Sequence, residues 1–167
     1  NIGIINYGVG NHLSVVRAIK SLGYRASLTN NINELKKLDS ILLPGVGSFS
    51  VAMHGLKKYR LLDFIQNWAH KKKQLIGICL GMQLLATKGT EGGVHEGLNL
   101  LPGEVVQISN NTMHIGWNSI NFTDKNNILS PYQGVDFYFN HSYKFIPKTD
   151  SVVATVKYGE NIPAIVH

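Results

Sequence analysis

The first hundred residues alternate short apolar runs with helix-spaced patterns, and this alternation restricts the possible folds more than any other feature. The strand-like runs lie at residues 2–6, 24–29, 40–43 and 74–78. Helical patterns lie between them, at residues 11–22, 49–56 and 61–72, and the polar stretch 30–39 has room for a short helix. Short buried strands that alternate with helices are typical of a parallel sheet covered on both faces. We therefore predict an α/β first half.

The helical pattern at residues 11–22 also predicts which side of that helix is buried. Leu13, Val16, Ile19 and Leu22 have the spacing of one helical face, and Gly23 is suited to end the helix. We expect this face to pack on the sheet.

The second half has a different residue pattern, in which strand-like runs are separated by polar turn clusters. The runs lie at residues 105–108, 115–122, 137–145 and 152–158, and the turn clusters at 110–111 and 124–127. This pattern favours hairpins or strands of a mixed sheet. No linker separates the halves, so we expect residues 1–167 to form a single domain: an open mixed sheet flanked by helices, with a β-rich second half.

Composition excludes several classes of protein. Hydrophobic residues make up 44% of the chain, which excludes an intrinsically disordered chain. No apolar stretch approaches the 18 or so residues that a membrane span needs, and a single cysteine excludes an internal disulfide. The net charge of +6 is spread, so we interpret it as a solvated basic surface and expect no nucleic-acid partner. We expect a cytoplasmic protein.

Residues 77–81, Gly-Ile-Cys-Leu-Gly, follow a predicted strand and precede apolar residues (Met82, Leu84, Leu85) that predict another helix. This is the pattern of a nucleophile elbow with Cys79 in place of serine. The glycines suit a tight, strained turn and have no other obvious packing purpose. The helix N-terminus is expected to lower the pKa of the thiol and to offer N–H donors to an oxyanion. The alternative is a buried cysteine that acts as a small hydrophobic residue.

A second glycine-rich turn, Pro-Gly-Val-Gly at residues 44–47, ends another predicted strand. Ligands of open α/β sheets bind beyond the carboxyl ends of the strands. The turn is therefore a candidate for donating N–H groups to a developing negative charge or to a phosphate. By itself the motif favours a plain tight turn over either of these roles.

A cysteine nucleophile needs a base, and the chain has seven histidines. We interpret four of them as surface residues: His12, His54, His70 and His95. His114, His141 and His167 lie in or beside strand-like segments, and each is more often structural than catalytic. No histidine has metal-ligand spacing, and Gly8 and Gly10 lack the third glycine of a dinucleotide fingerprint. We predict neither a metal nor a cofactor.

These motifs together resemble one family. Residues 77–85 are similar to the nucleophile segment of the class I (triad) glutamine amidotransferases. Four further segments occur in the same order as in the glutaminase subunits of imidazole glycerol phosphate synthase, an enzyme of histidine biosynthesis: residues 6–11, 43–49, 114–118 and 138–143.

The resemblance implies that Cys79 attacks the side-chain amide of glutamine, releases ammonia and forms a thioester that water hydrolyses. Backbone N–H groups of Val46 and Leu80 would form the oxyanion hole. The turn around Val46 would need a peptide reorientation, signalled by the partner, which its flanking glycines permit. The residues implied to line the glutamine site are Gly45, Gly47, Gln83, Glu91, His141, Ser142 and Tyr143.

The resemblance also implies a heterodimer with a cyclase subunit, a (β/α)₈ barrel that receives the ammonia. The products would be imidazole glycerol phosphate and an aminoimidazole carboxamide ribotide. Positions that match the partner-facing surface of the family are Asn11, Arg17, Trp117 and Asn118.

The chain departs from the family pattern near its end. The catalytic His and Glu of the family lie in a late His-Pro-Glu segment, and residues 1–167 contain none. We do not assign His167 as the base and expect residues 1–167 to lack a catalytic segment of roughly 30 residues. Asn6 and Met113 replace residues frequent in the family. Three alternatives stay open: a paralogue that feeds another synthase (for example one that amidinates a sugar), a non-catalytic partner-binding module, or a stand-alone cysteine hydrolase.

Overall fold

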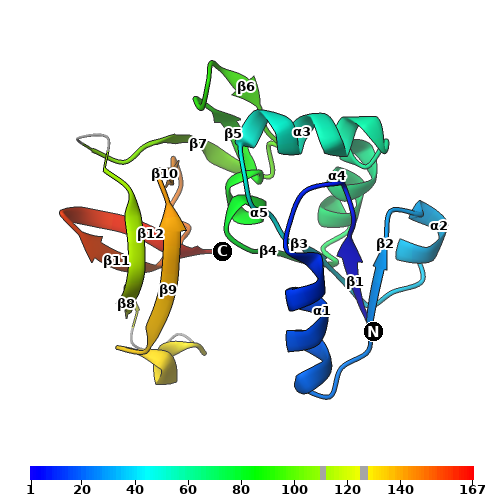
Figure 1. The fold of residues 1–167 in the computed structure, drawn as a ribbon, viewed down its shortest axis with the longest axis horizontal. Helices are drawn as coiled ribbons and strands as arrows, with labels where there is room; N and C mark the ends of the chain where they lie inside the picture. The colour runs from blue at the N-terminus through cyan, green and yellow to red at the C-terminus, as the bar shows by residue number, and fades with distance from the viewer. Residues whose placement is uncertain (110–111, 125–127) are drawn as a thin grey trace. The chain divides into compact units, whose positions relative to one another are not determined.

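The computed structural model describes residues 1–109, 112–124 and 128–167. The chain divides into two compact units, Asn1–Leu100 and Leu101–His167, which we describe separately (Figure 1). The predicted turn clusters at residues 110–111 and 124–127 lie outside the described residues, apart from Asp124. That residues 1–167 form one domain stays a prediction.

The first unit is built on a parallel four-stranded sheet. Its strands lie in the order β2-β1-β3-β4, and every recorded neighbour pair is parallel. The strands are β1 (Ile2–Ile5), β2 (Ala26–Thr29), β3 (Ser40–Leu43) and β4 (Gln74–Gly77). The predicted α/β first half is confirmed, because each short apolar run of the sequence has become one strand of this sheet.

Helices connect these strands, as the sequence predicted. They are α1 (His12–Ser21), α2 (Ile32–Leu35), α3 (Phe49–Lys58) and α4 (Leu62–His70) (Figure 1). Across the described part of the chain, no helix has the length and apolar character that a bilayer crossing requires.

Both faces of the parallel sheet are covered at its two central strands, β1 and β3. On one face, Ile4 and Leu42 pack against Ile19 of α1. On the other face, Gly3 lies so close to α2 that an added Cβ would meet a methyl carbon of Leu35 at 3.0 Å. Because successive strand residues point to opposite faces, strands covered on both sides need apolar residues at every position.

The predicted buried face of α1 is partly wrong. Ile19 is buried, but Leu13 and Leu22 are exposed. Val16 packs with Ile19 against the sheet as predicted, and Val15, which was not predicted, joins them. The helix is therefore rotated relative to the predicted face, and two leucines lie on its outer side.

The predicted helix after Cys79 is shorter than expected. Helix α5 (Leu80–Gln83) ends after one turn, and the chain continues into a hairpin of β5 (Ala86–Gly89) and β6 (His95–Glu96). The backbone of residues 84–87 accepts hydrogen bonds from the N–H groups of residues 97–100. This tertiary pairing outweighs the helical pattern of the leucines and directs the backbone into extended structure.

The second unit consists of strands and their connecting segments, and one of these segments contains the 3₁₀ turn η2 (Ser130–Tyr132). One antiparallel pair joins β7 (Leu101–Gln107) and β10 (Tyr143–Pro147). A four-stranded antiparallel sheet has the order β12-β11-β8-β9. Its strands are β8 (His114–Phe122), β9 (Asp136–His141), β11 (Val152–Tyr158) and β12 (Glu160–Val166) (Figure 1). The predicted β-rich second half is confirmed.

The single strand predicted at residues 137–145 is two strands. His141 ends β9 and pairs with His114, whereas Tyr143 begins β10 and pairs with Gln107 of β7. Ser142 stands between them, and its carbonyl accepts the Ile108 N–H at 2.9 Å. The apolar run passes from one sheet to another, which a continuous strand pattern does not reveal.

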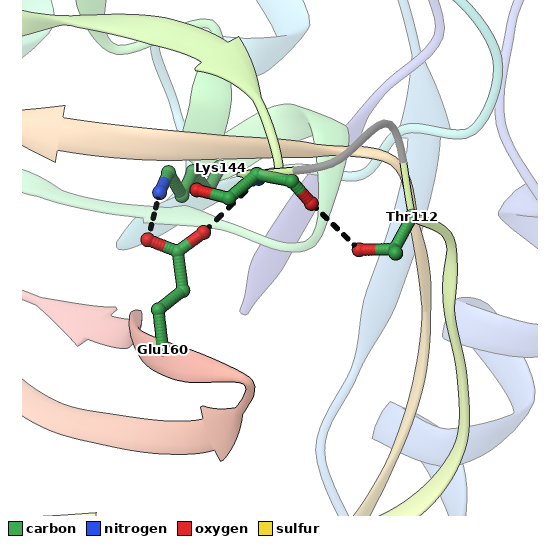
Figure 2. A network of polar contacts seen from close by, with 4 residues as sticks. Thr112, Lys144 and Glu160 are labelled. Atoms are coloured by element: carbon green, nitrogen blue, oxygen red, sulfur yellow. Dashed lines mark hydrogen bonds and ion pairs between the residues drawn. The ribbon is translucent and has the colours of Figure 1, made fainter.

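A partly buried ion pair joins the β11–β12 hairpin to the rest of the second unit. The Lys144 ammonium donates to Glu160, and the Ser109 N–H donates to the same carboxylate at 3.1 Å. The Thr112 hydroxyl then donates to the Ser109 carbonyl at 3.0 Å (Figure 2). The two donors to the Glu160 carboxylate, Lys144 first and then Ser109, lower its pKa from 4.5 to about 2.

We expect acid to weaken the second unit through Glu160. Because its pKa is lowered by folding, the carboxylate stabilises the unit above pH 4.5, and this stability is lost as the pH falls from 4.5 toward about 2. A Glu160→Gln variant should be less stable at neutral pH and lose less stability over that interval. Urea unfolding between pH 2 and 7 checks this, with the exposed Glu96→Gln as control. A Glu160→Gln profile parallel to wild type would contradict it.

Candidate active site

Cys79 lies between β4 and α5, at the carboxyl edge of the parallel sheet. Its backbone has φ 53° and ψ −117°, and it is the N-cap residue of α5. A positive φ is strained for a residue with a side chain. The predicted strand–elbow–helix arrangement is confirmed, with the strained conformation on the cysteine itself.

The glycines on either side of Cys79 have a packing purpose, contrary to the sequence interpretation. A Cβ on Gly81 would lie 1.8 Å from the Leu43 carbonyl oxygen at the end of β3. A Cβ on Gly77 would lie 2.7 Å from backbone atoms of Gly81 and Met82. Neither glycine has a positive φ. They are therefore needed for close approach of the elbow to β3 and of α5 to β4.

The pKa of Cys79 is raised, so the expected lowering by the helix N-terminus is wrong as a net effect. The thiol is reachable by solvent, but neighbouring protein atoms remove much of its hydration and disfavour the thiolate. The Leu80 N–H, which hydrogen-bonds to the sulfur, lowers the pKa by a smaller amount. A helix of one turn adds too little to reverse the sign.

The 44–47 turn continues β3 and lies directly against the elbow. A Cβ on Gly45 would be 2.9 Å from Leu80 Cβ and 3.0 Å from the Gly81 nitrogen. Gly47 has φ +99° and open space around it, and Val46 is exposed. Gly45 is thus required for contact with the elbow and Gly47 for its backbone conformation. The two segments predicted to supply oxyanion donors are neighbours.

Tyr7 is a component of this site that sequence reasoning missed. Its side chain is 1% exposed, and its hydroxyl donates to the Pro44 carbonyl. Burial, and secondarily the proximity of Cys79, raises the pKa of Tyr7 above its usual value, so the hydroxyl stays a donor. The available signal was an aromatic residue placed just after β1, at the sheet edge where β3 and β4 also end.

Glu91 reaches the same region from the residues after β5. Its Oε2 accepts the Phe49 N–H at 2.7 Å, at the first residue of α3. A Cβ on Gly89 would meet the Phe49 ring at 2.7 Å, so that glycine admits the ring. The carboxylate caps the helix that follows the 44–47 turn, where the helix dipole favours negative charge.

The remaining residues predicted to line the glutamine site divide between the units. Gln83 is buried on α5 in the first unit. His141, Ser142 and Tyr143 span the β9–β10 junction of the second unit. The structure thus brings together Cys79, Leu80, the 44–47 turn and Glu91 within the first unit, and the three junction residues within the second.

The predicted partner-facing residues are also divided. Asn11 and Arg17 are exposed, at the start of α1 and on its surface. Trp117 is 72% exposed and packs edge-on against Tyr138. Asn118 is half-buried, and its Nδ2 donates to the Lys157 carbonyl at 3.1 Å.

Of the histidines predicted to be on the surface, His12 is not a free surface residue. Its ring packs edge-on against Tyr7, and its Nε2 is buried. Burial lowers the pKa of His12 below its ordinary value. No group of three or more His, Cys, Asp or Glu side chains suited to a metal occurs within the described residues.

Comparison with known proteins decides the family. The family model for class-I glutamine amidotransferases matches residues 3–167. The chain belongs to the class-I glutamine amidotransferase family. Curated relatives named imidazole glycerol phosphate synthase subunit HisH include one from Staphylococcus epidermidis, 43% identical over 99% of this chain and 82% of its own length. Another, from Lactococcus lactis, is 42% identical over 99% and 84%.

Solved structures show that the chain has the amidotransferase fold. A crystal structure described as a glutamine amidotransferase superposes with a TM-score of 0.78, at 18% identity, over 99% of this chain and 84% of that one. PurLQS from Thermotoga maritima gives a TM-score of 0.68, at 20% identity, over 96% and 76%. The predicted amidotransferase-like fold, with mixed sheets, flanking helices and a strand-rich second half, is confirmed.

Proposed function

We propose that this chain is the glutaminase subunit of an imidazole glycerol phosphate synthase. The observation that carries the proposal is the strained elbow at Cys79, whose next residues lie against the Gly45 turn. This juxtaposition puts a thiol beside two segments that depend on glycine for their close packing. Relatives that bear the subunit's name are 38% to 43% identical over nearly the whole chain.

The geometry supports acyl transfer through a thioester. The Cys79 sulfur attacks the side-chain amide carbon of glutamine. The carbonyl oxygen becomes an oxyanion, which accepts hydrogen bonds from the backbone N–H groups of Val46 and Leu80. When the oxyanion collapses, the C–N bond breaks and the protonated nitrogen leaves as ammonia. Water then attacks the thioester, releases glutamate and returns the thiol.

The raised pKa of Cys79 means that a base has to take the thiol proton at neutral pH. In the family this base is the histidine of a His-Pro-Glu segment, which residues 1–167 do not contain. We assign the role to none of the seven histidines of this sequence, His167 included.

Glutamine would be held by polar groups. Glu91 presents a carboxylate to the substrate α-ammonium while its Oε2 continues to accept the hydrogen bond from the Phe49 N–H. We assign the rest of the glutamine site to the residues predicted from the sequence: Gly45, Gly47, Gln83, His141, Ser142 and Tyr143.

The partner would be a cyclase with a (β/α)₈ barrel, which uses the ammonia to make imidazole glycerol phosphate and an aminoimidazole carboxamide ribotide. The contacts we assign to it are Asn11 and Arg17 on the first unit and Trp117 and Asn118 on the second. The exposure of Trp117 supports this, because an exposed aromatic side chain is a frequent anchor of protein interfaces. A cytoplasmic location stays a prediction.

The test is glutamine hydrolysis with and without the cyclase partner. We expect the full-length gene product (the full chain) to hydrolyse glutamine slowly when it is alone. The nucleotide-loaded partner should accelerate this hydrolysis by ~10², because completing one oxyanion donor has about that effect. Imidazole glycerol phosphate should form in step with glutamate. Full activity without a partner would indicate a stand-alone hydrolase instead, and no hydrolysis with the partner would indicate a binding module.

Replacing Tyr7 with phenylalanine should impair this activity. The change removes the donor to the buried Pro44 carbonyl and costs about 1–3 kcal/mol of folding free energy. Because the turn then shifts relative to Leu80, we expect glutamine hydrolysis to fall about 10- to 100-fold. Steady-state assays on the complex check this, with the exposed Tyr24→Phe as control. Wild-type activity in Tyr7→Phe would show that the hydroxyl does not hold the turn.

A further inference from the structure

A chain of side-chain hydrogen bonds crosses the second unit from β8 to the start of β10. Asn118 Nδ2 lies 3.4 Å from His114 Nε2, and His114 Nδ1 lies 3.0 Å from His141 Nε2. His141 Nδ1 in turn lies 2.8 Å from the Tyr143 carbonyl oxygen. The chain therefore joins Asn118, assigned to the partner surface, with the junction residues assigned to the glutamine site.

The Tyr143 carbonyl, at one end of this chain, determines which group donates and which accepts in each hydrogen bond. The Tyr143 carbonyl only accepts, so His141 Nδ1 carries the proton and, in the neutral ring, Nε2 accepts. His141 Nε2 must accept the hydrogen bond that His114 Nδ1–H donates, which leaves His114 Nε2 as an acceptor for the Asn118 amide. The Asn118 Oδ1 accepts the Ser119 N–H at 3.1 Å, consistent with this orientation. Both imidazoles are neutral, each with one tautomer.

His114 is held firmly in the middle of the chain. It is 2% exposed, and its ring is stacked between Phe139 and Tyr158, with centroid distances of 4.6 and 4.3 Å. Burial lowers the pKa of His114 and of His141, which keeps both rings neutral. A proton on either ring would place two N–H groups face to face, so the neutral pair is required for the chain.

We propose that His114 is a positioning residue for the glutamine site. Through His141 it holds the Tyr143 carbonyl, and with it residues 141–143, in one orientation. Through Asn118 it ties that orientation to the part of β8 that carries Trp117. A partner contact that moves this part of β8 would then alter the β9–β10 junction. The inference rests on the proposed function, which assigns the junction to glutamine binding.

The test compares two variants of nearly the same shape in the full chain with its cyclase partner. His114→Leu removes the donor to His141, whereas His114→Asn retains an N–H near the position of Nδ1. Both lose the stacked ring, so their difference reports the hydrogen bond. We expect His114→Leu to raise the KM for glutamine about 3- to 10-fold, the loss typical of one hydrogen bond. In His114→Asn the KM for glutamine should stay close to the wild-type value. Ammonia-dependent synthesis should be unchanged in both variants.

A second readout does not depend on enzymatic activity. In ¹⁵N NMR titrations of the full chain, His141 should keep its proton on Nδ1 and titrate below its ordinary pKa in wild type and His114→Asn. In His114→Leu its pKa should rise, because protonation of Nε2 no longer opposes an N–H group. An unchanged His141 titration in His114→Leu would overturn the inference. So would equal KM values for the two variants. Absence of glutaminase activity in wild type, with the NMR result intact, would contradict only the proposed function.

Discussion

Replacing Cys79 with alanine is expected to abolish glutamine-dependent synthesis while leaving ammonia-dependent synthesis intact. Without the sulfur no thioester forms, and loss of a nucleophile of this kind lowers kcat by at least about 10⁴-fold. Alanine keeps the Cβ, so the strained backbone at φ 53° is retained and the fold should be unaffected. The measurement is product formation with glutamine and, separately, with ammonium chloride, on the complex with the cyclase partner.

The ammonia-dependent reaction is the internal control, because its chemistry belongs to the partner. Mass spectrometry after incubation of wild type with glutamine should also reveal a glutamyl adduct on Cys79 that the variant cannot form. Retention of glutamine-dependent turnover in Cys79→Ala would remove the nucleophile assignment and leave the elbow as a structural feature.

Replacing Gly81 with alanine is expected to damage the site without touching a reacting atom. The added Cβ would lie 1.8 Å from the Leu43 carbonyl oxygen, a backbone atom that also accepts the Ile78 N–H at 3.0 Å. The elbow must therefore move away from β3, at a cost of about 3 kcal/mol. Because Leu80 moves with it, glutamine hydrolysis should fall about 100-fold or more.

Urea unfolding and steady-state assays on the same preparation separate the two effects. The matched control is Gly23→Ala, which has φ +83° and no atom within 4 Å of an added Cβ. That variant should lose about 1–2 kcal/mol through backbone strain and keep its activity. Equal activity of Gly81→Ala and Gly23→Ala would show that close packing of the elbow on β3 is not needed for catalysis.

The parts of the fold that local pattern specifies were predictable. The strands β1, β3 and β4 coincide with short apolar runs, and α3 and α4 with helical spacing, because burial on one or both faces imposes those periods. The elbow at Cys79 was also predictable from local pattern, because its strand, glycines and helix are contiguous in the chain.

Features that depend on pairing between distant segments were not predictable. The helix after Cys79 was overpredicted because residues 97–100 pair with the backbone that follows it. Residues 137–145 were predicted as one strand because nothing in that run reveals that His141 and Tyr143 pair with different sheets. The contact of Glu91 with the start of α3 spans 42 residues of sequence.

The sequence by itself determined where the candidate nucleophile lies, which turns accompany it and, through ordered motifs, the family. Only the tertiary structure decided the chemistry of individual groups. The tertiary structure raises the pKa of Cys79, where a lowered pKa was expected. It also places the Tyr7 hydroxyl against the 44–47 turn and determines the tautomers of His114 and His141. The reason is physical: desolvation and hydrogen-bond direction depend on atoms from separate strands, and their approach is decided only when the sheets pack.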